Sequence, residues 1–298
     1  MSATQTTAEK RPLSPVIDRK YPKPKLKLPP GACDTHFHFI GPQKFYPLKA
    51  KHVFSHLEFE DTPIEDWLKL QDALGLQRGL HVQSMMYENN YEIVLHGQCR
   101  LPDRLRAVVI PHDGITDKEL EILTANGVVG YRITNRLEKT INHRLIARTH
   151  EHGWSTHYLF REEVPADWRK TILNSPGRFV IEHMGNPRIE QGVNGPDFKF
   201  VLECLDTGRC WLKLSPRFSK EETFPFSDVT PFIHKVVEHA PDRLLWGSDW
   251  PHPQYFRPMP NDTALLDLML DWVPDEKTRN KIFVDNPAEI FGFPPLKS

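Results

Sequence analysis

The sequence predicts a (β/α)8 barrel, in which parallel strands alternate with helices around a closed sheet. Short apolar segments alternate with amphipathic segments of helical length, without interruption, from about residue 32 to about residue 270. Eight such pairs fit in roughly 250 residues, which is the usual size of a barrel. The alternative is a doubly wound open sheet, but the chain has neither a GxGxxG nor a GxxxxGK[ST] phosphate loop.

The expected elements follow one another at short intervals. Strands are expected over 32–39, 78–83, 105–110, 128–133, 154–160, 179–182, 211–214 and 244–246. Helices are expected over 62–74, 91–99, 116–126, 142–152, 165–174, 198–205, 230–239 and 264–270. The first helix begins with Thr62-Pro63-Ile64-Glu65, which has the pattern of a capping box with proline at the first helical position.

The remaining segments predict an arm, a long loop and a closing element. Residues 1–30 are rich in Pro and Lys and predict an extended N-terminal arm, so the barrel domain is expected over 31–298. The loop 40–61 is long enough to suggest a functional role. Residues 276–293 predict helix that closes the barrel floor or packs on its side.

Composition excludes several classes of partner. A net charge of -1 offers no electrostatic attraction to nucleic acid or to an anionic membrane. No apolar run is long enough to span a bilayer, and the polar N-terminus predicts no secretory signal. The four cysteines form no CxxC pair, so a reduced, cytoplasmic protein is expected. A monomer and a homo-oligomer are both compatible with the sequence.

Asp249 stands directly after the last expected strand, in Trp246-Gly247-Ser248-Asp249-Trp250. Barrel enzymes carry their chemistry at the carboxyl ends of the strands, so this carboxylate is a candidate site residue, although an Asp can also cap a turn. Pro251 and Pro253 bracket His252 and stiffen the turn. His252 is therefore expected to support this loop, with a secondary contact to a ligand at the rim.

Histidines end two other strands. His36 and His38 are two apart on the first strand, so both rings point the same way and can hold one metal ion or one anion. The alternative is a pair of core histidines bonded to the backbone. His183 precedes a Gly-Asn-Pro turn after the sixth strand, where it can act as a ligand or as a hydrogen-bond donor.

Arginines at the ends of strands suggest anion binding. An arginine facing a barrel interior is costly unless an anion pairs with it, so Arg132 and Arg136 together predict a carboxylate or phosphate clamp. The alternative for Arg132 is an internal salt bridge, for example with Glu138 or Glu182. Arg217 adds a cation after the seventh strand, with a solvated loop arginine as its alternative.

The sequence alone does not decide the role of Ser84 or the orientation of the fifth strand. Ser84, after the second strand, is either a ligand contact or ordinary turn material. The fifth strand presents either His157 or Tyr158 to the interior, because neighbouring side chains point to opposite faces.

Three motifs in order resemble the amidohydrolase superfamily: Asp34-Thr35-His36-Phe37-His38, Ile181-Glu182-His183-Met184-Gly185 and the segment Trp246–Pro253. More narrowly they resemble its branch that hydrolyses 2-pyrone-4,6-dicarboxylate and 4-sulfomuconolactone. The resemblance implies a distorted barrel over about residues 30–293, with Asp249 as the base that activates water. It also implies that His36, His38 and His183 orient or polarise the lactone carbonyl.

The resemblance further suggests the substrate and its contacts. The predicted function is hydrolysis of a small anionic lactone, carboxylated or sulfonated, such as a pyrone dicarboxylate or a muconolactone. Arg132, Arg136 and Arg217 are the candidates for binding its anionic groups, with Tyr46, Ser84 and Tyr158 as further contacts. The alternatives are a metal-dependent decarboxylase of the same superfamily and a non-catalytic barrel that binds a small molecule.

The resemblance also bears on metals. Binuclear members of the superfamily bridge two metals with a lysine at the end of strand four, where this chain has Arg132, so two metals are not expected. No metal requirement is the favoured interpretation, because several cations near the carbonyl would repel a divalent ion. The alternative is one Zn²⁺ held by His36, His38, His157 and Asp249.

Overall fold

The computed structural model describes residues 11–161, 163–253 and 258–294. Its core is one eight-stranded sheet in which all paired strands are parallel and sheet order follows chain order. The strands are β1 (Cys33–Phe37), β2 (Arg78–Val82), β3 (Leu105–Val109), β4 (Val128–Thr134), β5 (Ser155–Leu159), β6 (Phe179–Ile181), β7 (Cys210–Leu214) and β8 (Leu244–Trp246). A parallel bridge between Phe37 and Trp250 joins the first and last strands beyond β8. The predicted barrel is therefore confirmed.

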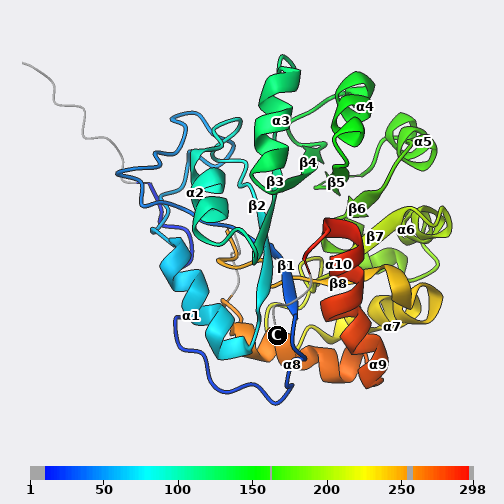
Figure 1. Ribbon diagram of the computed structural model, residues 1–298. Helices are drawn as coiled ribbons and strands as arrows, with labels where there is room; N and C mark the ends of the chain where they lie inside the picture. Colours follow the sequence, from blue (N-terminus) through cyan, green and yellow to red (C-terminus); the bar gives the residue numbers. More distant parts are fainter. Residues whose placement is uncertain (1–10, 162, 254–257, 295–298) are drawn as a thin grey trace, which may run out of the picture.

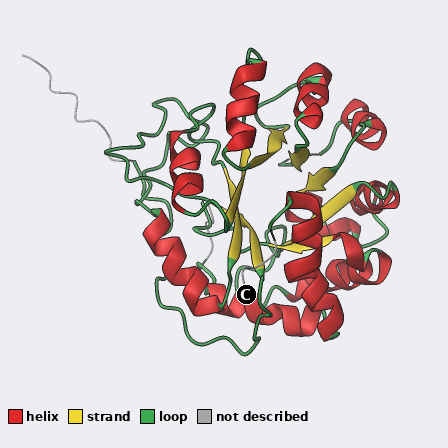
Figure 2. Cartoon of the chain, viewed as in Figure 1, coloured by secondary structure: helices red, strands yellow, loops and turns green. Residues whose placement is uncertain are grey.

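Helices surround the strands, as Figures 1 and 2 show. They are α1 (Ile64–Leu74), α2 (Glu92–Arg100), α3 (Asp117–Ala125), α4 (His143–Glu151), α5 (Ala166–Asn174), α6 (Pro196–Asp206), α7 (Thr230–His239), α8 (Asp262–Trp272), α9 (Glu276–Asn280) and α10 (Asn286–Phe291). A π-helical turn, Lys281–Asp285, connects the last two. One predicted helix stands between each strand and the next, which is the arrangement that parallel strands require.

Apolar side chains fill both faces of the barrel wall. The larger cluster packs the outer face of the strands against the helices and includes Tyr131, Tyr158 and Phe179. A smaller cluster inside the barrel joins strand residues such as Val82 and Leu245 to side chains of the C-terminal segment. Its members Ile290, Phe291 and Phe293 show that residues 276–293 close the barrel floor, one of the two predicted placements.

The predicted capping box before α1 is wrong. The structure gives Pro63 as the N-cap residue and no side-chain cap at this end. Thr62 instead pairs through its backbone with Ile40, and its buried hydroxyl has no hydrogen-bond partner within the described ranges. This antiparallel bridge fixes Thr62 beside the loop, so its hydroxyl does not cap the first helical turn. A capping box does form at the start of α3, between Thr116 and Glu119.

The described part of the N-terminal arm lies along the barrel. The amide of Ser14 donates to the carbonyl of Glu58 (2.7 Å), and the amides of Lys25 and Leu26 donate to the carboxylate of Asp267 on α8. These contacts tie the arm to the long loop and to the last large helix. In the described residues, none of the helices combines the length and the apolarity that a membrane crossing would need.

Candidate active site

The site forms where the first and last strands meet at their carboxyl ends. The amide of Asp249 donates to the carbonyl of His36 (2.8 Å), and the amide of His38 donates to the carbonyl of Trp250 (2.8 Å). This approach requires a glycine, because a Cβ at Gly247 would lie 2.6 Å from the Cβ of His36. The two strand ends therefore hold Asp249 and the histidines against one another.

A buried carboxylate below this junction fixes the loop after β8. The side chain of Asp34 accepts hydrogen bonds from the amide (2.9 Å) and the hydroxyl (2.7 Å) of Ser248. Burial is the main cause that raises the pKa of Asp34 to about 6. The backbone of Asp249 adopts φ 62, a left-handed conformation that is costly for a non-glycine residue. The hydrogen bonds of Ser248 help to hold it there.

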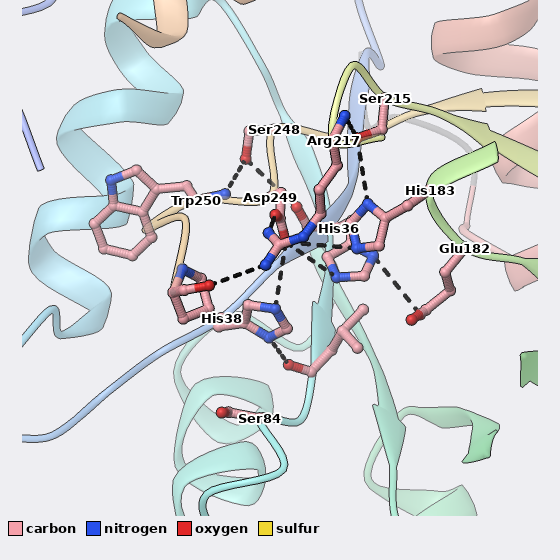
Figure 3. Close-up of polar contacts among 12 residues, drawn as sticks. His36, His38, Ser84, Glu182, His183, Ser215, Arg217, Ser248, Asp249 and Trp250 are labelled. Atoms are coloured by element: carbon pink, nitrogen blue, oxygen red, sulfur yellow. Dashed lines mark hydrogen bonds and ion pairs between the residues drawn. The ribbon is translucent and has the colours of Figure 1, made fainter. Parts of the chain in front are cut away.

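One oxygen of Asp249 faces three imidazoles. Its Oδ1 lies 3.5 Å from Nε2 of His36, 3.6 Å from Nε2 of His38 and 3.7 Å from Nε2 of His183 (Figure 3). All four side chains are nearly inaccessible to solvent. The structure thus brings together the four residues that the sequence suggests for catalysis.

The partners of the other ring nitrogens indicate the protonation of these histidines. Nδ1 of His38 contacts the carbonyl of Val82 (2.6 Å), which can only accept, so this nitrogen carries the proton. Nδ1 of His183 contacts the hydroxyl of Ser215 (3.3 Å). Burial lowers the pKa of His183 to about 3 and also lowers those of His36 and His38. The three rings are therefore neutral near pH 7.

A buried ionic network lies behind His36. Lys213 on β7 places its Nζ 3.2 Å from Nδ1 of His36 and 3.5 Å from the carboxylate of Glu182. Burial lowers the pKa of Lys213 to about 8, so it is mainly an ammonium near neutral pH. It then donates to Nδ1 of His36, which places the ring proton on Nε2, toward Asp249.

Glu182 anchors this network. Its Oε2 accepts from Nε (2.9 Å) and Nη2 (2.8 Å) of Arg132. The internal salt bridge, one of the two alternatives for Arg132, is thus present. Sequence reasoning named Glu182 as a possible partner of Arg132 but missed its contact with Lys213 and the role of Lys213 itself, although a charged residue within an apolar strand segment is a usable signal.

Arg217 occupies the other side of the Asp249 carboxylate. Its guanidinium forms an ion pair with Oδ2 of Asp249 and also donates to the carbonyl of Pro253 (3.0 Å). Despite burial, the attraction of Arg217 and the neighbouring histidines holds the pKa of Asp249 well below its usual range. The carboxylate is therefore ionised.

Further predicted ligand contacts are Arg136, Ser84 and Tyr46. The guanidinium of Arg136 is exposed and lies over the ring of Phe54, 4.7 Å from its centroid. Ser84 is buried after β2, and its hydroxyl accepts from the amide of Met86 (3.4 Å). The ring of Tyr46 contacts His96 on α2 (5.7 Å between centroids).

The structure settles which side chain of β5 faces inward. Tyr158 lies in the outer cluster beside Phe179, so the predicted substrate contact by Tyr158 is wrong. His157 faces the interior, with Nε2 3.1 Å from the hydroxyl of Ser155 and Nδ1 3.7 Å from Glu182. Alternation along the strand places only one of the two inside.

His252 lies just beyond Asp249 and is buried. Its Nε2 lies 2.9 Å from Oδ1 of Asp262, at the start of α8. This ion pair raises the pKa of His252 although burial opposes the charged form. The contact agrees with a supporting role in the loop.

Comparison with known proteins gives the family. The family model described as amidohydrolase matches residues 33–293. The chain belongs to the amidohydrolase family. The enzyme class expected from the three motifs is thereby confirmed.

Curated relatives of this amidohydrolase act on lactones, according to their names. It is 34% identical to 4-sulfomuconolactone hydrolase of Rhizobium radiobacter over 276 residues, covering 89% of this chain and 91% of that protein. It is 29% identical to 2-pyrone-4,6-dicarboxylate hydrolase of Comamonas testosteroni, with 90% and 92% of the two chains covered. It is also 29% identical to D-galactarolactone isomerase of Agrobacterium fabrum, covering 92% of this chain and 96% of that protein.

Two overlapping groups in this amidohydrolase offer ligand atoms close enough to hold a metal ion. One is His36, His38 and Asp249, and the other is His36, Glu182 and His183. His38 fits such a role, because its unprotonated Nε2 faces the site. His36 fits less well while Lys213 donates to its Nδ1, since its Nε2 then carries a proton. His157 belongs to neither group, so the predicted four-residue zinc set does not assemble among the described residues.

Proposed function

We propose that this amidohydrolase opens a small anionic lactone by adding water to its ester carbonyl. The observation that carries the proposal is that the two carboxylate oxygens of Asp249 have different partners. Its Oδ2 is held by Arg217, whereas Oδ1 faces three imidazoles in a buried site. The names of the curated relatives support a lactone as the substrate.

Asp249 acts as the general base in this proposal. Its carboxylate is ionised, and Arg217 fixes its orientation by holding Oδ2, so that Oδ1 can accept a proton from water. The resulting hydroxide oxygen bonds to the lactone carbonyl carbon. The ring C–O bond then breaks, and Asp249 returns the proton to the departing oxygen, so that atoms and charge balance.

His36 and His183 stabilise the charge that develops on the carbonyl oxygen, whereas the unprotonated Nε2 of His38 can only accept a hydrogen bond in the site. Nε2–H of His36 is the best-defined donor, because Lys213 fixes the tautomer from the other side of the ring. Since burial keeps the rings of His36 and His183 neutral, these two histidines act through hydrogen bonds rather than through a full charge. Arg136, at the exposed end of β4, is available for the anionic group of the substrate.

We further propose that the reaction does not require a metal. The cations Lys213 and Arg217 already contact His36 and Asp249, and positive charge at these places opposes a divalent ion. If an ion does bind, His36, His38 and Asp249 are the residues that would hold it. It would then supply Lewis-acid polarisation of the carbonyl.

A screen of carboxylated, sulfonated and sugar-acid lactones tests the proposal. Each is incubated with the enzyme, with and without a chelator, and the product is identified by mass. Hydrolysis adds one water, isomerisation leaves the mass unchanged, and decarboxylation removes carbon dioxide. A gain of water in the presence of chelator is expected. Loss of carbon dioxide only with added metal would favour the decarboxylase instead.

A further inference from the structure

Arg161 is a further cation, which lies just beyond the carboxyl end of β5. Its backbone amide donates to Oδ1 of Asn135, which follows β4 (3.0 Å). The carbonyl of the preceding residue, Phe160, accepts from the side chain of Asn186, which follows β6. Side chains from both neighbouring strand ends therefore fix the backbone from which Arg161 extends.

The guanidinium of Arg161 has no counter-ion among the described residues. Its Nε is buried without a hydrogen-bond partner, and no described carboxylate forms an ion pair with it. The contrast with its neighbours is clear, because Arg132 is paired with Glu182 and Arg217 with Asp249. Burial and the fields of Arg217, Arg132 and Arg136 lower the pKa of Arg161 to about 9, so it remains charged near pH 7.

A partly buried guanidinium whose Nε has no partner among the described residues is unfavourable, and the surrounding arginines increase the cost. An anionic ligand would supply the missing charge. A guanidinium presents two parallel N–H groups that match the oxygens of a carboxylate, and a sulfonate offers a similar edge. Arg161 follows β5 and Asp249 follows β8, so both stand at the carboxyl ends of barrel strands, and the charge of Asp249 acts on Arg161.

We propose that Arg161 binds the anionic substituent of the substrate and thereby selects carboxylated or sulfonated lactones. The inference rests on the proposed function for the position of the lactone ring beside Asp249. Strands β6 and β7 separate β5 from β8 in the sheet. A ligand held by Arg161 and attacked at Asp249 therefore has its anionic group at the end of β5 and its scissile carbonyl at the end of β8.

Steady-state kinetics of Arg161→Gln and Arg161→Lys test this role. We expect Gln to raise KM for an anionic lactone by about 10- to 100-fold, the usual range for loss of a charged hydrogen bond, with kcat little changed. Lys should recover part of the loss because it keeps the charge. The methyl ester of the same lactone should not distinguish wild type from Arg161→Gln. Arg188→Gln is the matched control, because Arg188 is a half-exposed arginine paired with Asp197.

Calorimetric titration with citrate, a polycarboxylate that cannot undergo lactone hydrolysis, separates this inference from the proposed function. Citrate binding that is weakened by Arg161→Gln and partly restored by Arg161→Lys supports the inference, even if no lactone is hydrolysed. Equal KM values and equal citrate affinities in wild type and Arg161→Gln would overturn it, even if hydrolysis is confirmed. The Lys variant also covers the case in which the Gln variant fails to fold.

Discussion

The guanidinium of Arg217 forms an ion pair with the carboxylate of Asp249, and only 9% of either side chain is exposed. The pair holds one carboxylate oxygen and leaves the other toward the histidines. Because the pKa of Asp249 lies well below 3.8, its carboxylate is ready to accept a proton at any pH near neutrality. Arg217 thus orients the proposed base, Asp249, and also keeps it ionised.

Asp249→Asn should abolish turnover while the site keeps its shape. The amide is close in size to the carboxylate but cannot take a proton from water, so kcat should fall by about 10²- to 10⁴-fold. Citrate binding, measured by calorimetry, should stay within a few-fold of wild type. An Asn variant with undiminished kcat would remove Asp249 from the role of base.

The pH profile should reveal the effect of Arg217. Since the pKa of Asp249 is depressed, its active, ionised form is lost only when the pH falls through a value below 3.8. Wild-type kcat/KM should therefore show no acid limb from Asp249 at moderately acidic pH. In Arg217→Gln, the nearby cation no longer opposes the effect of burial on the pKa of Asp249, so the acid limb should move to higher pH. Identical profile shapes would contradict this coupling.

Metal removal should leave hydrolysis intact. After dialysis against a chelator, residual metal is measured by elemental analysis and kcat is compared with that of the untreated protein. We expect unchanged kcat with far less than one metal per chain. Loss of activity that added Zn²⁺ restores would instead assign a metal to His36, His38 and Asp249.

Glu182→Gln should destabilise the barrel strongly. Removing one partner of a buried ion pair leaves uncompensated charge on Arg132 and Lys213, at a cost of about 3–5 kcal/mol in the free energy of unfolding. Urea denaturation measures this cost. Glu289→Gln is the control, because Glu289 forms an ion pair at an exposed position and should change stability by less than about 1 kcal/mol.

The difference in unfolding free energy between wild type and Glu182→Gln should depend on pH. The pKa of Glu182 in the folded protein lies well below the value of 4.5 for a free glutamate. Its stabilising contribution is therefore complete above pH 4.5 and is lost as the pH falls through the folded value. The difference in unfolding free energy between wild type and Glu182→Gln should narrow below pH 4.5. A constant difference from pH 7 to pH 4 would contradict the assignment.

The strands and helices could be predicted because their alternation is a local property of the sequence. The orientation of β5 could not be predicted, because both faces of a barrel wall are buried. All five residues of this strand are buried in the structure. His157 and Tyr158 are therefore indistinguishable by pattern. Only the completed barrel shows which of them faces the interior.

The site was predictable where the chemistry lies at strand ends, as with His36 and Asp249. It was only partly predictable where two strands share an ion pair. Arg132 was compatible with an external anion or with a salt bridge to Glu138 or Glu182, and the structure shows its pairing with Glu182, two strands away. Arg161 gave no signal, because an arginine in a loop is ordinarily solvated. The burial of its Nε without a partner among the described residues is visible only in three dimensions.

The bond between Ser248 and Asp34 joins positions 214 residues apart in the chain. The proposed base is therefore aligned only after the last strand has docked beside the first. A nascent or partly folded chain would lack that alignment, however many of the intermediate strands it had paired. During refolding, hydrolysis should consequently recover later than the helical circular dichroism signal. The return of activity would then report the final closure of the barrel and not its early assembly.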